Sequence, residues 1–117
     1  MQQMLIEVQQ TYYDYVAKIQ GSSQMIANLL KVNELEHAFQ LITDLSEGIT
    51  WIVTVEQHML ENNYIINSRT PEVIEQLYYL NELIERKDID NLSQLFEHKL
   101  ARLFENSSEW IFEKVEN

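Results

Sequence analysis

The chain contains no cysteine, and only two glycines and one proline among its 117 residues. Without cysteine it can build no disulfide framework, cysteine-based zinc site or thiol nucleophile, which agrees with the reducing cytoplasm where we expect it. Few glycines and prolines leave few tight turns, and 45% hydrophobic residues are typical of a folded chain. We therefore expect one helical domain over residues 1–117, a usual domain length.

Long apolar runs and basic residues are scarce as well. No window approaches the roughly 18 consecutive apolar residues of a membrane-spanning helix, and the first residues lack the pattern of a signal peptide. Nineteen Asp and Glu stand against eight Lys and Arg, so the formal net charge is −11. Because that field repels phosphate groups, we expect neither a nucleic acid nor a membrane as partner.

Apolar residues recur at spacings of three and four along most of the chain, a pattern that predicts α-helices. We expect an all-α fold, an antiparallel four-helix bundle with helices at about 3–31, 34–60, 71–86 and 89–115. Asn33 is a good N-cap for the second helix, Thr70-Pro71 suits the start of the third, and Asp88 or Asp90 the start of the fourth. Short connections after the first and third helices favour antiparallel neighbours.

Gly21 leaves two interpretations of the first segment open. One long helix can tolerate a glycine that costs about 1 kcal/mol relative to alanine, or the helix can bend and restart at the serines that follow. We favour the continuous helix, because the apolar stripe that includes Ile19 and Ile26 keeps its phase across the glycine.

The sequence shows no catalytic constellation, so we expect no enzymatic activity and no cofactor. Glu34 and His37 have the Glu-x-x-His spacing of di-iron bundles, but such a site needs two copies of the motif, and only one is present. We expect no metal site. A bundle that binds a metal or a small ligand through Glu56 and the histidines stays open as an alternative function.

Glu56 is the one carboxylate that continues an apolar seam, because it follows Ile49 and Ile52 and precedes Met59 at helical spacing. A buried carboxylate has a raised pKa unless it is paired. We favour a glutamate near the end of the bundle that is hydrogen-bonded to a tyrosine or to water, and a functional role stays open.

Aromatic and apolar residues outside the main seams form a candidate interaction surface. Trp51 and Val55 lie to the side of the second helix's apolar stripe, and Tyr13 and Tyr79 are expected to point outward, because adjacent tyrosines on a helix cannot share a face. Two interpretations stay open, half-burial on broad helix faces or contact with a partner or a second copy. The candidate surface comprises Tyr13, Trp51, Val55, Tyr64, Ile65, Ile66 and Tyr79. Of these, Tyr64-Ile65-Ile66 can cover the bundle end or bind a partner.

Two stretches resemble parts of uncharacterised small all-helical proteins of Gram-positive bacteria. They are residues 47–51 in the second helix and, in the fourth, Lys87-Asp88-Ile89 followed by Leu92, Leu95-Phe96-Glu97 and Trp110. Where the fourth helix of those proteins has Ala-Asp and Tyr-Glu pairs, this chain has Ser93-Gln94 and His98-Lys99. The resemblance implies a helical fold and carries no activity, cofactor or site.

The leading functional hypothesis is a non-enzymatic protein-interaction module, such as an adaptor, a chaperone-like protein or a regulator. The acidic surface and the surplus of aromatic side chains favour it. A structural homo-oligomer is the third alternative.

Overall fold

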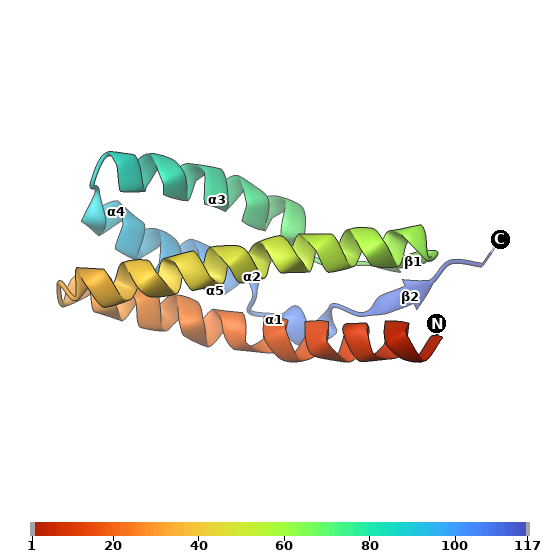
Figure 1. Ribbon diagram of the computed structural model, residues 1–117. Helices are drawn as coiled ribbons and strands as arrows, with labels where there is room; N and C mark the ends of the chain where they lie inside the picture. The colour runs from red at the N-terminus through yellow and green to blue at the C-terminus, as the bar shows by residue number, and fades with distance from the viewer. Residues whose placement is uncertain (1, 117) are drawn as a thin grey trace.

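Two long antiparallel helices, α1 (Gln2–Lys31) and α2 (Leu35–Glu61), form one side of the molecule (Figure 1). The computed structural model describes residues 2–116. Helix α1 runs without a break through Gly21, so the prediction of a continuous helix is confirmed. Gly21 has no positive φ, and a β-carbon there would meet no atom within 4 Å, so neither the backbone conformation nor a close contact requires glycine at this position.

The turn between α1 and α2 uses Asn33 differently from the prediction. Asn33 does not cap α2; it adopts a positive φ of 63°, a conformation that asparagine tolerates better than most residues. The N–H of Glu34 donates to the carbonyl of Leu29 at 2.9 Å, and that of Asn33 to the carbonyl of Leu30 at 3.2 Å. This is a Schellman motif, which ends α1 and reverses the chain direction.

Strand β1 (Tyr64–Ile66) follows α2, and helix α3 (Thr70–Glu85) then runs back along the molecule. The fourth helical segment is α4 (Ile89–Gln94), a π-helical turn η1 (Leu95–Leu100) and α5 (Ala101–Leu103). Its predicted start is confirmed at Asp88, whose carboxylate accepts a hydrogen bond from the Asn91 N–H at 3.2 Å.

The fourth helix ends earlier than the predicted residue 115. After α5 the chain forms a short 3₁₀ turn, η2 (Ser107–Glu109), and then strand β2 (Phe112–Lys114). Strand β2 pairs antiparallel with β1, so that Ile66 lies opposite Phe112. The prediction of helix over this part of the chain is wrong.

Side-chain burial explains this ending. Trp110 and Phe112 are buried and Ile111 between them is exposed, an alternation that an extended chain provides and a helix does not. The Trp110 ring packs on Phe104 with 5.2 Å between centroids. The hydroxyl of buried Ser107 donates to the Val16 carbonyl of α1 at 3.3 Å, so the turn is held against α1.

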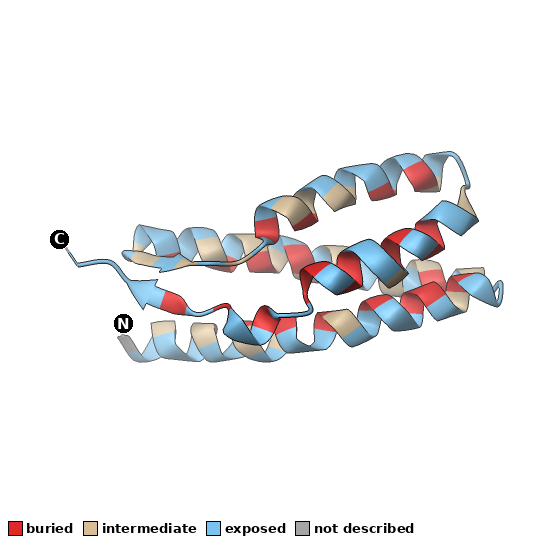
Figure 2. Ribbon diagram, turned by 180° about the vertical axis from the view of Figure 1, so that it is seen from behind, coloured by how far each residue is buried: buried red, intermediate tan, exposed pale blue. Residues whose placement is uncertain are grey.

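The core lies between α1, α2 and the fourth helical segment, where buried residues face one another (Figure 2). The molecule measures 51 × 20 × 20 Å. The predicted all-α, bundle-like fold is confirmed, with one small two-stranded sheet at the end opposite the α1–α2 turn. Among the described residues, no helix has both the length and the hydropathy to cross a membrane.

Candidate functional site

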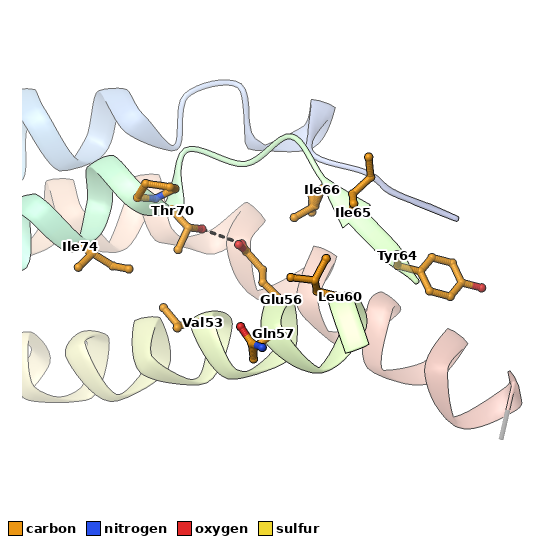
Figure 3. A pocket seen from close by; sticks show the side chains of 10 residues that line it. Val53, Glu56, Gln57, Leu60, Tyr64, Ile65, Ile66, Thr70 and Ile74 are labelled. Carbon is orange, nitrogen blue, oxygen red and sulfur yellow. Dashed lines mark hydrogen bonds between the residues drawn. The ribbon is translucent and has the colours of Figure 1, made fainter. Parts of the chain in front are cut away.

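A groove runs between α2 and α3 and leaves apolar side chains of both helices open to solvent. It consists of two hollows of about 360 and 260 Å³ that share Val53 of α2 and Ile74 of α3, which point toward each other across it (Figure 3). We call it the α2–α3 groove. Its walls are formed by Ile49, Thr50, Val53, Glu56, Gln57, Leu60, Tyr64, Ile65, Ile66, Thr70, Pro71, Ile74, Leu77, Tyr78 and Asn81.

The groove exists because α3 packs on α4 and η1. Buried Val73, Leu80 and Leu83 form one stripe of α3 at helical spacing. Ile74 and Leu77 lie beside that stripe and are only partly buried, while Tyr78 is 72% exposed. Helix α3 therefore has more apolar surface than its own chain covers.

Glu56 lies in the larger hollow and joins three parts of the chain. Its Oε2 atom accepts a hydrogen bond from the Tyr12 hydroxyl of α1 at 2.6 Å. The same atom accepts from the Thr70 hydroxyl, in the first turn of α3, at 2.7 Å (Figure 3). The hydroxyl of Thr70 in turn accepts from that of Ser68 at 3.1 Å. The interpretation of Glu56 as a carboxylate bonded to a tyrosine is confirmed.

The pKa of Tyr12 is affected strongly by this arrangement. Burial raises the pKa of its phenol far above the usual range, and the hydrogen bond to Glu56 and the negative charge of Glu56 raise it further. Tyr12 is therefore a neutral hydrogen-bond donor, fully buried beneath a half-buried carboxylate.

The two helices that form the groove carry charge of one sign only. Helix α2 contains five acidic residues and α3 contains four, and neither contains a lysine or an arginine. Arg69 and Arg86 flank α3 at its two ends, and the Nε of Arg69 lies 2.5 Å from the Glu72 carboxylate. The acidic residues are Glu36, Asp44, Glu47, Glu56 and Glu61 of α2, and Glu72, Glu75, Glu82 and Glu85 of α3.

The prediction for Trp51 and Val55 chose the wrong flank of α2. Val55 is only 5% exposed and belongs to the core, so it is no part of a free surface. Trp51 is partly buried, with its ring edge-to-face against Tyr15 of α1 at 5.9 Å. Gly48, on the same flank, lets the Tyr15 phenol lie where a β-carbon would otherwise be. This flank of α2 is covered by α1.

The predicted tyrosines have different surroundings. The prediction that Tyr13 points outward is wrong: it is partly buried against the core, and its hydroxyl accepts a hydrogen bond from the N–H of Phe112 at 3.0 Å, so it holds β2 against α1. Tyr79 is exposed as predicted, with Lys99 Nζ 5.6 Å from its ring centroid. Tyr78 is more exposed than Tyr79 and lines the groove, which the sequence analysis missed.

The segment Tyr64-Ile65-Ile66 is the part of the predicted surface that does line the groove. It forms β1, packs against the end of α2 and borders the larger hollow. Ile65 is 50% exposed, and Leu60 of α2 beside it is 54% exposed. The segment thus closes one end of the groove and still presents apolar surface to solvent.

The histidines do not gather around Glu56. His37, His58 and His98 are all exposed, and His37 lies in the first turn of α2, far along the helix from Glu56. Within residues 2–116, no group of three or more histidine and carboxylate side chains lies close enough to hold a metal ion.

Sequence reasoning missed Tyr12 and Thr70 as partners of Glu56. They lie 44 and 14 residues away from it, and only the packing of three helices brings them together. Val53 and Ile74 could have been predicted as groove residues. Each is an apolar residue that directly follows a buried residue of its helix, Ile52 or Val73, and so lies at the edge of the buried stripe.

Residues 7–109 match the model described as Domain of unknown function (DUF8042). The chain belongs to the DUF8042 family. The span matched by DUF8042 includes both walls of the groove and the Glu56, Tyr12 and Thr70 cluster. No curated protein and no solved structure matches the chain.

Proposed function

We propose that this DUF8042 protein is a non-enzymatic protein-interaction module, and that a segment of another protein binds in its α2–α3 groove. The observation that carries the proposal is the row of exposed apolar side chains along the groove, which includes Leu60, Ile65 and Tyr78. Exposed aromatic and aliphatic side chains that lie together in a concave surface are typical of binding sites.

The groove suits a protein segment better than a nucleic acid or a lipid surface. Its two helices present carboxylates and no basic residue, so phosphate groups would be repelled. A bound segment would remove the apolar walls from water. Each Å² of apolar surface buried in this way contributes about 25 cal/mol of favourable free energy, and this is the main favourable term in protein association.

Affinity purification at native expression, followed by mass spectrometry, tests the proposal. Three forms are compared: the unaltered chain, Tyr78→Asp in the groove, and Ile6→Asp on α1 as a control. Both substitutions replace an exposed apolar side chain by a carboxylate. We expect a partner to be recovered with the unaltered chain and with Ile6→Asp, and to be lost with Tyr78→Asp.

Two results would contradict the proposal. Recovery of the chain alone, under mild salt, would leave no partner for the groove. Recovery of the same proteins with all three forms would place the interaction elsewhere. Light scattering on the three forms decides the homo-oligomer alternative, because a dimer that Tyr78→Asp dissociates would mean that a second copy occupies the groove.

We also propose the cytoplasm of a Gram-positive bacterium as the setting of this protein. Support comes from the resemblance carried by residues 47–51 and by Lys87-Asp88-Ile89. Cell fractionation with an antibody against the chain tests it, and recovery in a secreted or envelope fraction would contradict it.

A further inference from the structure

The α2–α3 groove is about as long as three turns of an α-helix. Its α2 wall runs from Ile49 to Leu60, which at 1.5 Å per residue is about 17 Å. Its α3 wall runs in the opposite direction, from Pro71 to Asn81. A channel with two apolar walls binds an amphipathic helix through side chains at positions i, i+3 or i+4, and i+7.

The charge of the walls restricts the occupant further. Of the nine carboxylates on α2 and α3, Glu56 lines the groove itself, and the other eight add negative charge to the helices that form its walls, which contain no lysine or arginine. Complementary charge favours a partner whose flanks are basic and disfavours an acidic one. A second copy of this chain also has a net charge of −11, so its approach to Glu56 would be opposed by charge repulsion.

Glu56 has a carboxylate oxygen that one of those basic side chains could bind. Both of its hydroxyl partners, Tyr12 and Thr70, donate to Oε2, so Oε1 is left for another donor. Among residues 2–116, no lysine, arginine or histidine lies within 4.0 Å of this carboxylate. Two neutral hydroxyls orient a half-buried negative charge at the edge of an apolar hollow and leave that charge unneutralised.

We infer that the partner segment is an amphipathic helix with a lysine or arginine next to its apolar stripe, and that this cation binds Oε1 of Glu56. The inference rests on the proposed function and adds the chemistry of the partner. Apolar side chains of the segment fill the hollow between Val53 and Ile74, and the cation lies at the end near Thr70. Glu56 fixes the register of the helix, because a charged hydrogen bond in a partly desolvated site is directional.

Selection from a displayed library of random peptides of about 18 residues, long enough for five helical turns, tests the inference. The bait is the full chain, and peptides that still bind Tyr78→Asp are discarded. We expect the remaining sequences to share an apolar stripe at i, i+3 or i+4, and i+7 with a lysine or arginine at one fixed position beside it. Fluorescence anisotropy then gives the affinity of each peptide.

A double-mutant cycle identifies the role of Glu56 without relying on one variant. Glu56→Gln keeps an acceptor for Tyr12 and Thr70 and should weaken binding about tenfold, as loss of a charged hydrogen bond does. Replacing the peptide's conserved cation by norleucine should weaken binding to the unaltered chain by a similar factor and have little effect on Glu56→Gln. Glu36→Gln, an equal charge change at the other end of α2, should alter affinity by less than about twofold.

The outcomes separate the inference from the function on which it rests. Peptides that need Tyr78 but lack a fixed cation, or that bind Glu56→Gln as tightly as the unaltered chain, would overturn the inference and leave the groove as a binding site. A library that yields no peptide dependent on Tyr78 would overturn both. An acidic consensus would overturn the argument from charge.

Discussion

The two flanks of α2 have similar side chains and different neighbours. On one flank, Val55 is buried in the core, Trp51 packs on Tyr15 of α1, and the absence of a side chain at Gly48 lets Tyr15 lie against the helix. On the other flank, Val53 faces Ile74 of α3 across an open groove, and Leu60 lines the same groove beside β1 (Figure 3). A helix flank rich in apolar residues is thus covered or open according to where the next helix packs, and only the open flank of α2 is available to a partner.

The largest expected effect on stability comes from replacing a valine by alanine, and it should differ between the two flanks of α2. Val55→Ala should lower the free energy of unfolding by about 2 kcal/mol, because a buried side chain leaves a cavity when it is shortened. Val53→Ala should cost less than about 1 kcal/mol, since Val53 already faces solvent in the groove. Urea denaturation of both variants measures the difference, and equal losses would mean that the groove flank is packed as tightly as the other.

Tyr12→Phe should lower the free energy of unfolding by about 1.5 kcal/mol. It removes one of the two hydroxyls that bind Glu56 and leaves the ring in place, and hydrogen bonds to charged groups contribute about 1.5–3 kcal/mol. Denaturation at pH 7 gives the value. Tyr13→Phe, which also removes a tyrosine hydroxyl from α1, is the matched control and should cost less, because its partner is a neutral N–H.

Stability should also fall as the pH rises above about 10. The pKa of Tyr12 is raised in the folded chain, so above the ordinary tyrosine pKa of about 10 the unfolded chain releases a proton that the folded chain keeps. The free energy of unfolding then declines by up to about 1.4 kcal/mol per pH unit for this group, and below that pH the group contributes no slope. Burial also raises the pKa of Tyr15, so Tyr12→Phe should reduce the decline and not abolish it. Denaturation at pH 9 and pH 11 measures it, and an identical slope in Tyr12→Phe would contradict the assignment.

Substitution of the two glycines by alanine should change the free energy of unfolding in opposite directions. Gly48→Ala places a β-carbon where the Tyr15 phenol lies, so the ring must leave Trp51, and we expect a net loss of about 1 kcal/mol. Gly21→Ala meets no atom and should raise the free energy of unfolding by about 1 kcal/mol through helix propensity. Thermal melts of the two variants give the signs, and a stabilising Gly48→Ala would show that Tyr15 does not depend on this close approach.

The smallest expected change in stability comes from a substitution in the groove. Tyr78 is 72% exposed, so Tyr78→Asp should alter the free energy of unfolding by less than about 0.5 kcal/mol. The same substitution should abolish capture of the partner. A large loss of stability on urea denaturation would mean that Tyr78 supports the fold, and the binding result could then not be assigned to the groove.

The helices could be predicted from the sequence because their signals are local. Apolar spacing across Gly21 predicted a continuous α1, and Asp88 was one of the two predicted starts of the fourth helix. The end of that helix could not be predicted in the same way, because the pairing of β2 with β1 and the burial of Trp110 and Phe112 depend on contacts with distant segments.

The candidate site depended on contacts between distant segments. Glu56 was recognised as unusual from its place in an apolar seam, but its partner Tyr12 is 44 residues away and Thr70 is in another helix. Val55 was assigned to a free surface because sequence cannot show which flank α1 covers. The position of α3, set by the packing of Val73 and Leu83 on the fourth helical segment, decides which apolar flank stays open.

Site-specific photo-crosslinking in cells of the native host tests the central claim most directly. A photoreactive residue replaces Gln57, which lines the groove, or Gln40, an exposed glutamine of α2 beyond it. We predict a covalent adduct with one partner protein from position 57 and none from position 40. Adducts of equal yield from both positions, or no adduct from position 57, would contradict the assignment of the α2–α3 groove as the interaction site.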